Sequence, residues 1–407
     1  MQPPGTIGQS SQLGTLAAAP AAHQPEWQDR PAYREACRAL SSAPPLVTAT
    51  EVRQLREALA RLVTGDALVL QLGDCAESFH ECTPRHTARK LDVINRLGNR
   101  LTELTGRGVI RIGRMGGQFA KPRSQAIERH AGLSMPPFRG HMINSEVATP
   151  AARAADPQRM VRAYEAGDRV QRLMRTYRQA TGPAAVAAGP WSSHEALVID
   201  YESRLVRRDP DTDDRYLGSA HLPWIGERTR QPAGGHVALL ASVVNPVGCK
   251  IGPAADPEDV VRMCEVLDPA REPGRLVLIP RMGRDLVQEA LPPIVRAVTH
   301  AGHPVIWLSD PMHGNTVRSL TGQKTRHLTD VVTEALRFRD VVEEHGQYAA
   351  GLHIEVAADD VTECIGGSVT DDDLRRHYTS LCDPRLNAEQ ATELLEAWVK
   401  GTVTCRS

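Results

Sequence analysis

Charged side chains follow several short apolar runs of this sequence, and one set of them is basic. Arginine can hold a phosphate or carboxylate through two parallel hydrogen bonds, whereas lysine supplies a compact positive charge. Cations around one opening would repel one another unless anions met them, so the set indicates substrates with phosphate and carboxylate groups. For any single cation, a solvated surface charge is the better interpretation, but the apolar residues that flank Lys250 favour a functional role there. The set comprises Arg114, Lys121, Arg123, Arg228, Lys250 and Arg281.

A second set combines one thiol, one imidazole and two carboxyl groups. Together these donors suit a divalent transition ion such as Mn²⁺, Co²⁺, Fe²⁺ or Zn²⁺. The spacing is too wide for a linear metal motif, and a lone cysteine such as Cys75 is often a small buried hydrophobe. His353 and His377 are alternative imidazole ligands. The set comprises Cys75, His313, Glu355 and Asp383.

Eight short apolar runs alternate with amphipathic helical stretches, and both sets lie mainly just after these runs. The alternation predicts an α/β fold with a parallel sheet, and the count favours a closed (β/α)8 TIM barrel. Loops after the strands of a barrel meet at its C-terminal face, so we expect the active site there. The clearest predicted helices are Pro257–Leu267, Asp285–Thr299 and Thr329–Glu344. The predicted strands are Ala67–Leu72, Val109–Ile112, Ala184–Ala187, Ala220–Ile225, Val247–Ile251, Arg275–Ile279, Pro304–Leu308 and Gly351–Ile354.

Three regions follow from composition and periodicity. Residues 1–25 are rich in Gly, Pro, Ala and Gln, which predicts a mobile N-terminal arm. Residues 26–63 form a predicted N-terminal helical extension, with apolar residues from Val52 to Leu62 at helical spacing. Residues 64–407 then make up the barrel, which we expect to be the catalytic domain.

The overall composition excludes some classes of partner. The formal net charge of −1 gives no bulk electrostatic reason to bind nucleic acid or an anionic membrane. No run approaches the roughly 20 apolar residues that cross a bilayer, and the N-terminus lacks the pattern of a secretory signal. The eight cysteines form no CxxC pair, which is typical of reduced thiols. We therefore expect a cytoplasmic protein.

Several motifs are long and unusual, and they resemble those of the type II, plant-like 3-deoxy-D-arabino-heptulosonate 7-phosphate (DAHP) synthases. They occur in that family's order from about residue 45 to 390. The motifs are GDCAES at 73–78, RMGGQFAKPRS at 114–124, HEALVIDYE at 194–202, WIGERTRQ at 224–231, NPVGCKIGP at 245–253, DPMHGNT at 310–316, HIEV at 353–356 and CDPRLN at 382–387.

The resemblance implies a barrel enzyme that binds one divalent metal ion, Mn²⁺ or Co²⁺ first, with Zn²⁺ and Fe²⁺ as alternatives. Its ligands would be Cys75, His313, Glu355 and Asp383. The implied substrates are phosphoenolpyruvate and erythrose 4-phosphate, whose phosphate would meet Arg123 and Ser124. The family habit also implies a homodimer. Phosphoenolpyruvate would lie among Arg114, Lys121, Glu227, Arg228, Lys250 and Arg281, and the catalytic residues would be Lys121, Glu227, Lys250 and Arg281.

The implied reaction is an aldol-type condensation. The metal polarises the aldehyde of erythrose 4-phosphate, and C3 of phosphoenolpyruvate attacks the aldehyde carbon. Water then adds at C2, and phosphate leaves with cleavage of a C–O bond. We expect Lys121, the first residue of the KPRS motif, to help protonate the aldehyde oxygen.

One departure from the family concerns regulation. Longer members have an extra helical segment between the positions of Ser124 and Trp224, and that segment is linked to subunit contacts and to inhibition by aromatic amino acids. This chain is shorter there, so we expect weak or absent feedback, as in members that serve secondary metabolism.

Three other functions remain open from the sequence. A synthase of the aminoshikimate type would use a nitrogen-bearing analogue of erythrose 4-phosphate, and the motifs do not separate the two substrates. A metal-dependent aldolase would use pyruvate and release no phosphate. A non-catalytic barrel is disfavoured because every expected ligand and cation is present.

Overall fold

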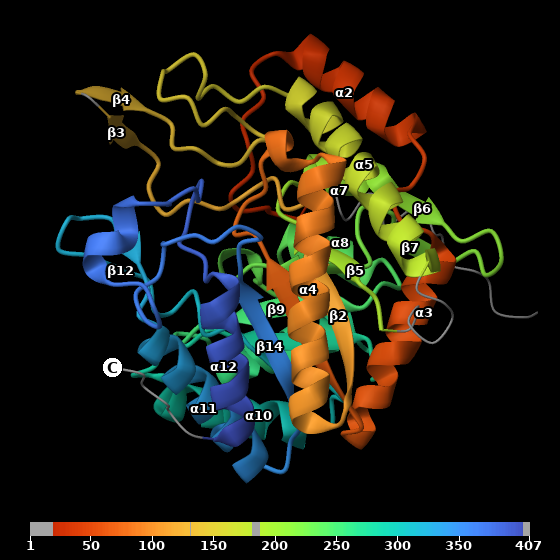
Figure 1. Cartoon of the computed structure of the whole chain (residues 1–407). Helices are drawn as coiled ribbons and strands as arrows, with labels where there is room; N and C mark the ends of the chain where they lie inside the picture. Colours follow the sequence, from red (N-terminus) through yellow and green to blue (C-terminus); the bar gives the residue numbers. More distant parts are fainter. Residues whose placement is uncertain (1–18, 131, 181–187, 402–407) are drawn as a thin grey trace, which may run out of the picture.

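A computed structural model describes residues 19–130, 132–180 and 188–401 of the chain. Eight parallel strands close into a barrel in the order β1-β14-β11-β10-β9-β8-β5-β2, with helices on the outside (Figure 1). The fold is therefore the predicted (β/α)8 barrel. Its strands are β1 (Ala67–Gly73), β2 (Gly108–Arg114), β5 (Trp191–Glu195), β8 (Leu222–Ile225), β9 (Val247–Ile251), β10 (Leu276–Pro280), β11 (Ile306–Ser309) and β14 (Ala349–Glu355).

Seven of the eight predicted runs coincide with barrel strands, and the third does not. The predicted run Ala184–Ala187 lies outside the described residues, and the barrel strand at this point is β5. A search for apolar runs does not find this strand, because its residues Ser192, Ser193 and His194 are polar although they are buried. Two of these side chains have buried hydrogen-bond partners: Ser192 bonds to His221, and His194 contacts Glu202, both at 2.8 Å.

Amphipathic helices surround the barrel, and α4 packs beside α12 (Figure 1). The helix predicted at Pro257–Leu267 has those bounds, and the other two predicted helices are shifted by at most two residues. The α-helices are α2 (Arg30–Ser42), α3 (Ala49–Ala60), α4 (Pro84–Thr105), α5 (Gln158–Ala180), α7 (Ile199–Glu202), α8 (Gly235–Ala241), α9 (Pro257–Leu267), α10 (Val287–His300), α11 (Leu328–Glu344) and α12 (Ala388–Lys400). Short 3-10 helices are η1 (Arg61–Thr64), η2 (Phe79–Glu81), η3 (Ser203–Leu205), η4 (Glu227–Thr229) and η5 (Asp371–Arg375).

Three short hairpins are inserted between barrel elements. The β3–β4 hairpin comes after β2, and the β12–β13 hairpin comes after β11, so both follow the carboxyl ends of barrel strands (Figure 1). The β6–β7 hairpin lies between β5 and β8. The hairpin strands are β3 (Glu128–His130), β4 (Leu133–Met135), β6 (Val206–Arg208), β7 (Arg215–Leu217), β12 (Val317–Arg318) and β13 (Lys324–Thr325).

The N-terminal extension consists of α2, α3 and η1. Helix α3 begins with a capping box in which Thr48 and Glu51 satisfy each other's backbone N–H groups. Glu51 also pairs with Arg175 and Arg178 of α5, which connects the extension to the barrel. The apolar positions predicted from the helical spacing, from Val52 to Leu62, are buried.

Most of the predicted mobile arm, residues 1–18, lies outside the described residues. The remainder of that arm contacts the barrel. The N–H of Gly235 donates to the carbonyl of Pro20 at 3.0 Å. The Gln24 side chain donates to the carbonyl of Leu197 at 2.8 Å and accepts from the N–H of Ile199 at 2.9 Å. No helix in the described part of the chain is long and apolar enough to cross a membrane.

Candidate active site

The carboxylate of Glu355 lies at the centre of a buried charge network at the C-terminal end of the barrel. Strand register places Gly73 between Arg114 on one side and Glu355 on the other. A Cβ at Gly73 would lie 2.8 Å from the carbonyl oxygen of Arg114, so glycine permits this close approach. Arg114 donates to Glu355 at 2.9 Å, and Arg326 donates to its other oxygen at 2.8 Å.

The predicted ligand His313 belongs to the same network. Its Nε2 lies 3.1 Å from Glu355, and its Nδ1 lies 2.8 Å from a carboxylate oxygen of Asp310. Burial alone would raise the pKa of Glu355, but His313, Lys121 and the two arginines hold it well below its ordinary value. Glu355 is therefore an anion that presents an oxygen beside the imidazole.

Cys75 and Asp383 form a second contacting pair. The backbone N–H of Asp383 lies 3.3 Å from the Cys75 sulfur. Burial opposes ionisation of Cys75, yet a hydrogen bond from Cys382 and the charge of Lys121 lower the pKa of the thiol to about 6. The Lys121 ammonium lies 2.5 Å from Asp383 and 3.9 Å from Glu355, so it contacts one acid of each pair.

These four side chains fit a divalent ion in their donor chemistry. A thiol that ionises readily, an imidazole and two ionised carboxylates are the ligand types that Mn²⁺, Co²⁺, Fe²⁺ and Zn²⁺ accept. Within the described residues, no three His, Cys, Asp or Glu side chains are close enough to form a complete ligand group as they stand. The Lys121 ammonium instead provides the positive charge between Asp383 and Glu355.

The two alternative imidazole ligands are engaged elsewhere. His353 is fully buried between Arg114, whose guanidinium lies 2.7 Å from its Nε2, and Gln71, which lies 2.7 Å from its Nδ1. His377 is exposed and bonds to the backbone carbonyl of Asp360 at 2.7 Å. The geometry therefore favours His313 over both.

A cavity of about 260 Å³ lies beside these donors and contains most of the predicted substrate-binding residues. Lys250 reaches it from β9 and pairs with Asp310 at 2.8 Å. Burial lowers the pKa of Lys250 to about 8, although Asp310 acts in the opposite direction. Glu227 accepts from the N–H of Gly252 at 2.6 Å, which connects the loops after β8 and β9. The lining comprises Lys121, Pro122, Glu195, Gly226, Glu227, Arg228, Lys250, Arg281, His313, Thr316, Lys324 and Asp383.

Three predicted binding residues lie outside that lining. Arg114 is buried beneath the cavity, where Glu355, His353 and a backbone carbonyl use its donors. Arg123 and Ser124 line a neighbouring cavity of about 600 Å³, whose wall includes His23 and Gln24 of the N-terminal segment. The two cavities adjoin at Arg228, which lines the smaller one and donates to Ser124 at 2.7 Å.

Three residues at this site were not indicated by the sequence: Glu195, Lys324 and Arg326. Glu195 ends β5, and burial raises the pKa of its carboxyl group although Lys250 and Lys121 act in the opposite direction. Gly226 leaves room for this position of Glu195, because a Cβ there would lie 2.1 Å from the Glu195 carboxyl oxygen. A correct position for β5 would have placed Glu195 at a strand end. Lys324 and Arg326 lie at the β12–β13 hairpin, where no periodicity indicates them.

Glu334 is another residue that the sequence did not indicate. It lies on α11 and accepts from the N–H groups of Met282 and Gly283 at 2.7 and 2.8 Å. Its other oxygen accepts from the Asn315 side chain at 2.6 Å. One buried carboxyl group therefore holds together the loops that contain Arg281 and His313.

The fold is a closed (β/α)8 barrel, and the lining of the cavity at its C-terminal face includes several lysine and arginine side chains. The sequence model of the class-II DAHP synthetase family matches residues 11–188 and 181–397. The chain belongs to this family, and it is a transferase-class enzyme, a 3-deoxy-7-phosphoheptulonate synthase of the shikimate route to aromatic compounds. Members of this family generally depend on a divalent metal ion.

Two relatives, at 44% and 39% identity, agree with this assignment. A probable phospho-2-dehydro-3-deoxyheptonate aldolase of Pseudomonas fluorescens is 44% identical over 379 residues, which covers 93% of this chain and 94% of that protein. A phospho-2-dehydro-3-deoxyheptonate aldolase of Streptomyces coelicolor is 39% identical over 421 residues, with 92% and 94% covered. A solved structure, a truncated DAHP synthase from Thermotoga maritima, overlaps 83% of this chain and 89% of its own at 15% identity and a TM-score of 0.38.

We predict that Glu334→Ala lowers both stability and turnover. It would leave two backbone N–H groups and the Asn315 amide without their acceptor, at a cost of about 3 kcal/mol in the free energy of unfolding. Because the loops with Arg281 and His313 would lose their shared partner, kcat/KM should fall about tenfold. Urea denaturation and steady-state kinetics measure the two effects. Glu334→Gln keeps one acceptor oxygen and should lose less of both, whereas an alanine variant with unchanged stability would contradict the role assigned to Glu334.

Proposed function

We propose that this enzyme condenses phosphoenolpyruvate with erythrose 4-phosphate and water and releases phosphate. The observation that supports these substrates is a surplus of guanidinium charge. Within the described residues, Arg123, Arg228 and Arg281 have no carboxylate partner; they contact only a sulfur, a hydroxyl and a backbone carbonyl. Two phosphates and one carboxylate would supply the missing anions.

The two adjoining cavities suggest how the substrates are divided. The smaller cavity holds Lys250, Arg281 and Arg228, which suit the carboxylate and phosphate of phosphoenolpyruvate. Arg123 and Ser124 lie across the boundary and suit the phosphate of erythrose 4-phosphate. The aldehyde end of that sugar would then extend from Ser124 past Lys121 toward the donor set.

We propose one divalent ion, Mn²⁺ or Co²⁺ first and Zn²⁺ or Fe²⁺ as alternatives, held by Cys75, His313, Glu355 and Asp383. When bound, it would supply Lewis acidity toward the aldehyde oxygen. Asp310 orients the imidazole of His313 through its Nδ1, and Arg326 fixes one oxygen of Glu355.

The remaining proposed roles belong to charged residues that face the cavity. Burial opposes the charge of Lys121, but Asp383 and Cys75 raise the pKa of its ammonium group, so it stays cationic. It would stabilise and protonate the developing alkoxide of the aldehyde. Lys250 and Arg281 would hold phosphoenolpyruvate and its leaving phosphate, and Glu227 would provide the carboxylate that faces them.

We predict that turnover depends on the metal. Chelation should lower the consumption of phosphoenolpyruvate by about a hundredfold or more, because several kcal/mol of transition-state stabilisation would be lost. Adding Mn²⁺ or Co²⁺ should restore it, with one phosphate released per phosphoenolpyruvate consumed. Loss of phosphoenolpyruvate absorbance and a phosphate assay give these two quantities. If folded, metal-loaded protein consumes no phosphoenolpyruvate with erythrose 4-phosphate, the proposed substrate pair is wrong, and the amino analogue of the sugar is the next substrate to try.

We predict that Lys121→Met lowers kcat by about a hundredfold or more, the size expected for loss of a proton donor. Bound metal, measured by elemental analysis, should stay close to one ion per chain. Lys324→Met is the matched control, because Lys324 also contacts Asp383, at 2.8 Å, but does not contact Glu355. Its kcat should change far less. Full turnover in Lys121→Met would remove this lysine from the mechanism.

We further propose a cytoplasmic homodimer with weak aromatic feedback that supplies secondary metabolism. The support is the family habit for the dimer and the short segment between Ser124 and Trp224 for the regulation. Phenylalanine, tryptophan and tyrosine at physiological concentrations should therefore reduce the initial rate little. Strong inhibition by any of them would refute the proposed loss of feedback.

A further inference from the structure

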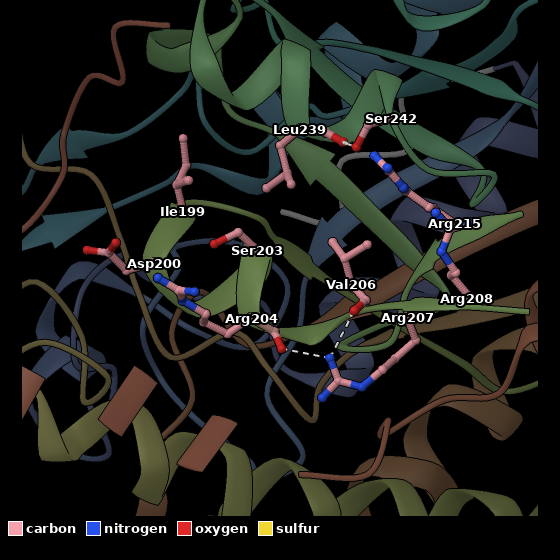
Figure 2. Close-up of a pocket in the computed structure, with 10 residues that line it drawn as sticks. All are labelled: Ile199, Asp200, Ser203, Arg204, Val206, Arg207, Arg208, Arg215, Leu239 and Ser242. Carbon is pink, nitrogen blue, oxygen red and sulfur yellow. Dashed lines mark hydrogen bonds between the residues drawn. The ribbon is translucent and has the colours of Figure 1, made fainter. Parts of the chain in front are cut away.

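A second cavity lies away from the active site, between the segment that follows β5 and helix α8. Its volume is about 480 Å³, within the usual range of small-molecule sites of roughly 300 to 1,000 Å³. It shares no lining residue with the active-site cavity. Figure 2 shows its lining, which comprises Ile199, Asp200, Ser203, Arg204, Val206, Arg207, Arg208, Arg215, Leu239 and Ser242.

Two of its arginines are already used by the fold. Arg207 donates to the carbonyls of Arg204 at 2.7 Å and Val206 at 2.9 Å, the bonds drawn in Figure 2. It also donates to two carbonyls at the end of α2. Arg208 pairs with Asp213 at 2.7 Å. Arg207 therefore has little capacity left for a ligand, and the charge of Arg208 is already paired.

The other two arginines, Arg204 and Arg215, are unused. Within the described residues, neither guanidinium has a hydrogen bond or an ion pair. The acid in the lining, Asp200, forms no ion pair with either of them, and its oxygens accept from Trp27 at 2.8 Å and Tyr33 at 2.7 Å. Arg204 also lines a groove on α2 beside Arg34 and Arg38, which adds to the local positive potential.

The unused cations lie on opposite sides of an apolar centre. In Figure 2, Arg204 and Arg215 extend from different sides of the cavity, with Ser203 and Val206 between them. Ile199 and Leu239 complete the apolar part of the lining. A single small anion would meet one guanidinium and leave the apolar surface uncovered, whereas a longer ligand could use both ends.

We infer that this cavity binds an elongated organic dianion with an acid group at each end of a compact apolar body. Carboxylate and phosphate both match a guanidinium, so the acid groups can be of either kind. A zwitterion is disfavoured because the lining has four arginines and a single acid, Asp200, whose oxygens already accept from Trp27 and Tyr33. Ser203 has a hydroxyl group near the centre that can complement a polar substituent.

Terephthalate is a suitable probe because its two carboxylates lie at opposite ends of a benzene ring. Isothermal titration calorimetry should show that it binds this protein. Benzoate, which has one carboxylate, should bind about tenfold or more weakly, the loss expected for one charge-assisted contact. Arg204→Gln and Arg215→Gln should each weaken terephthalate by a similar factor of about ten and bring it close to benzoate.

Arg262→Gln provides the matched control, because Arg262 is an exposed arginine on α9 that pairs only with acids of its own helix. It should leave both terephthalate binding and turnover unchanged. Thermal melting of the two cavity variants shows whether they remain folded. The inference is overturned if terephthalate does not bind at about 10 mM, which is about the weakest affinity of interest. Binding that survives both cavity substitutions, or equal affinity for benzoate and terephthalate, would also overturn it.

Discussion

The charge of Glu355 constrains the whole C-terminal face of this barrel. A carboxylate without solvent exposure costs several kcal/mol unless cations and donors meet it. Arg114 reaches it from β2 at 2.9 Å, and Arg326 reaches it from the hairpin after β11 at 2.8 Å. Because Arg114 also bonds to His353 and lies over the Trp224 ring, three barrel strands, β2, β8 and β14, adopt one arrangement around a single anion. The positions of His313 and Lys121 follow from that arrangement.

Further buried acids extend this principle to the loops. Asp310 lies between His313 and Lys250, and Glu334 joins the loops after β10 and β11. Such ion pairs contribute little net stability when they replace apolar packing, but removal of one partner is expensive. The arrangement therefore specifies positions more than it adds stability. Two cations that line the cavity differ in their partners: Lys250 pairs with the carboxylate of Asp310, whereas Arg281 donates only to the backbone carbonyl of His313.

The sequence predicted the barrel because seven strands are short, mostly apolar runs, which is the usual pattern of buried parallel strands. It misplaced the third strand because β5 is buried but polar, and with that strand it lost Glu195. The proposed ligand residues could be named from residue type and from the resemblance, and the structure brings them to one end. The sequence could not show that Arg123 and Ser124 would line a separate cavity, since that depends on how residues 123–155 fold against the N-terminal segment. The role of Arg326 could not be predicted either, because the short hairpin beside it has no periodic pattern.

The contacts of Gln24 have a practical consequence for how this chain can be altered. Its amide group satisfies backbone groups at Leu197 and Ile199, much as an added backbone strand would, while His23 and Gln24 close one side of the cavity that contains Arg123. Extra residues fused before position 19 would leave these contacts intact. A chain trimmed past Gln28 would open that side of the cavity to water, and it would also lose Trp27, which is buried and donates to Asp200 at 2.8 Å. Affinity tags therefore belong before residue 19, and their removal by a protease should stop short of it.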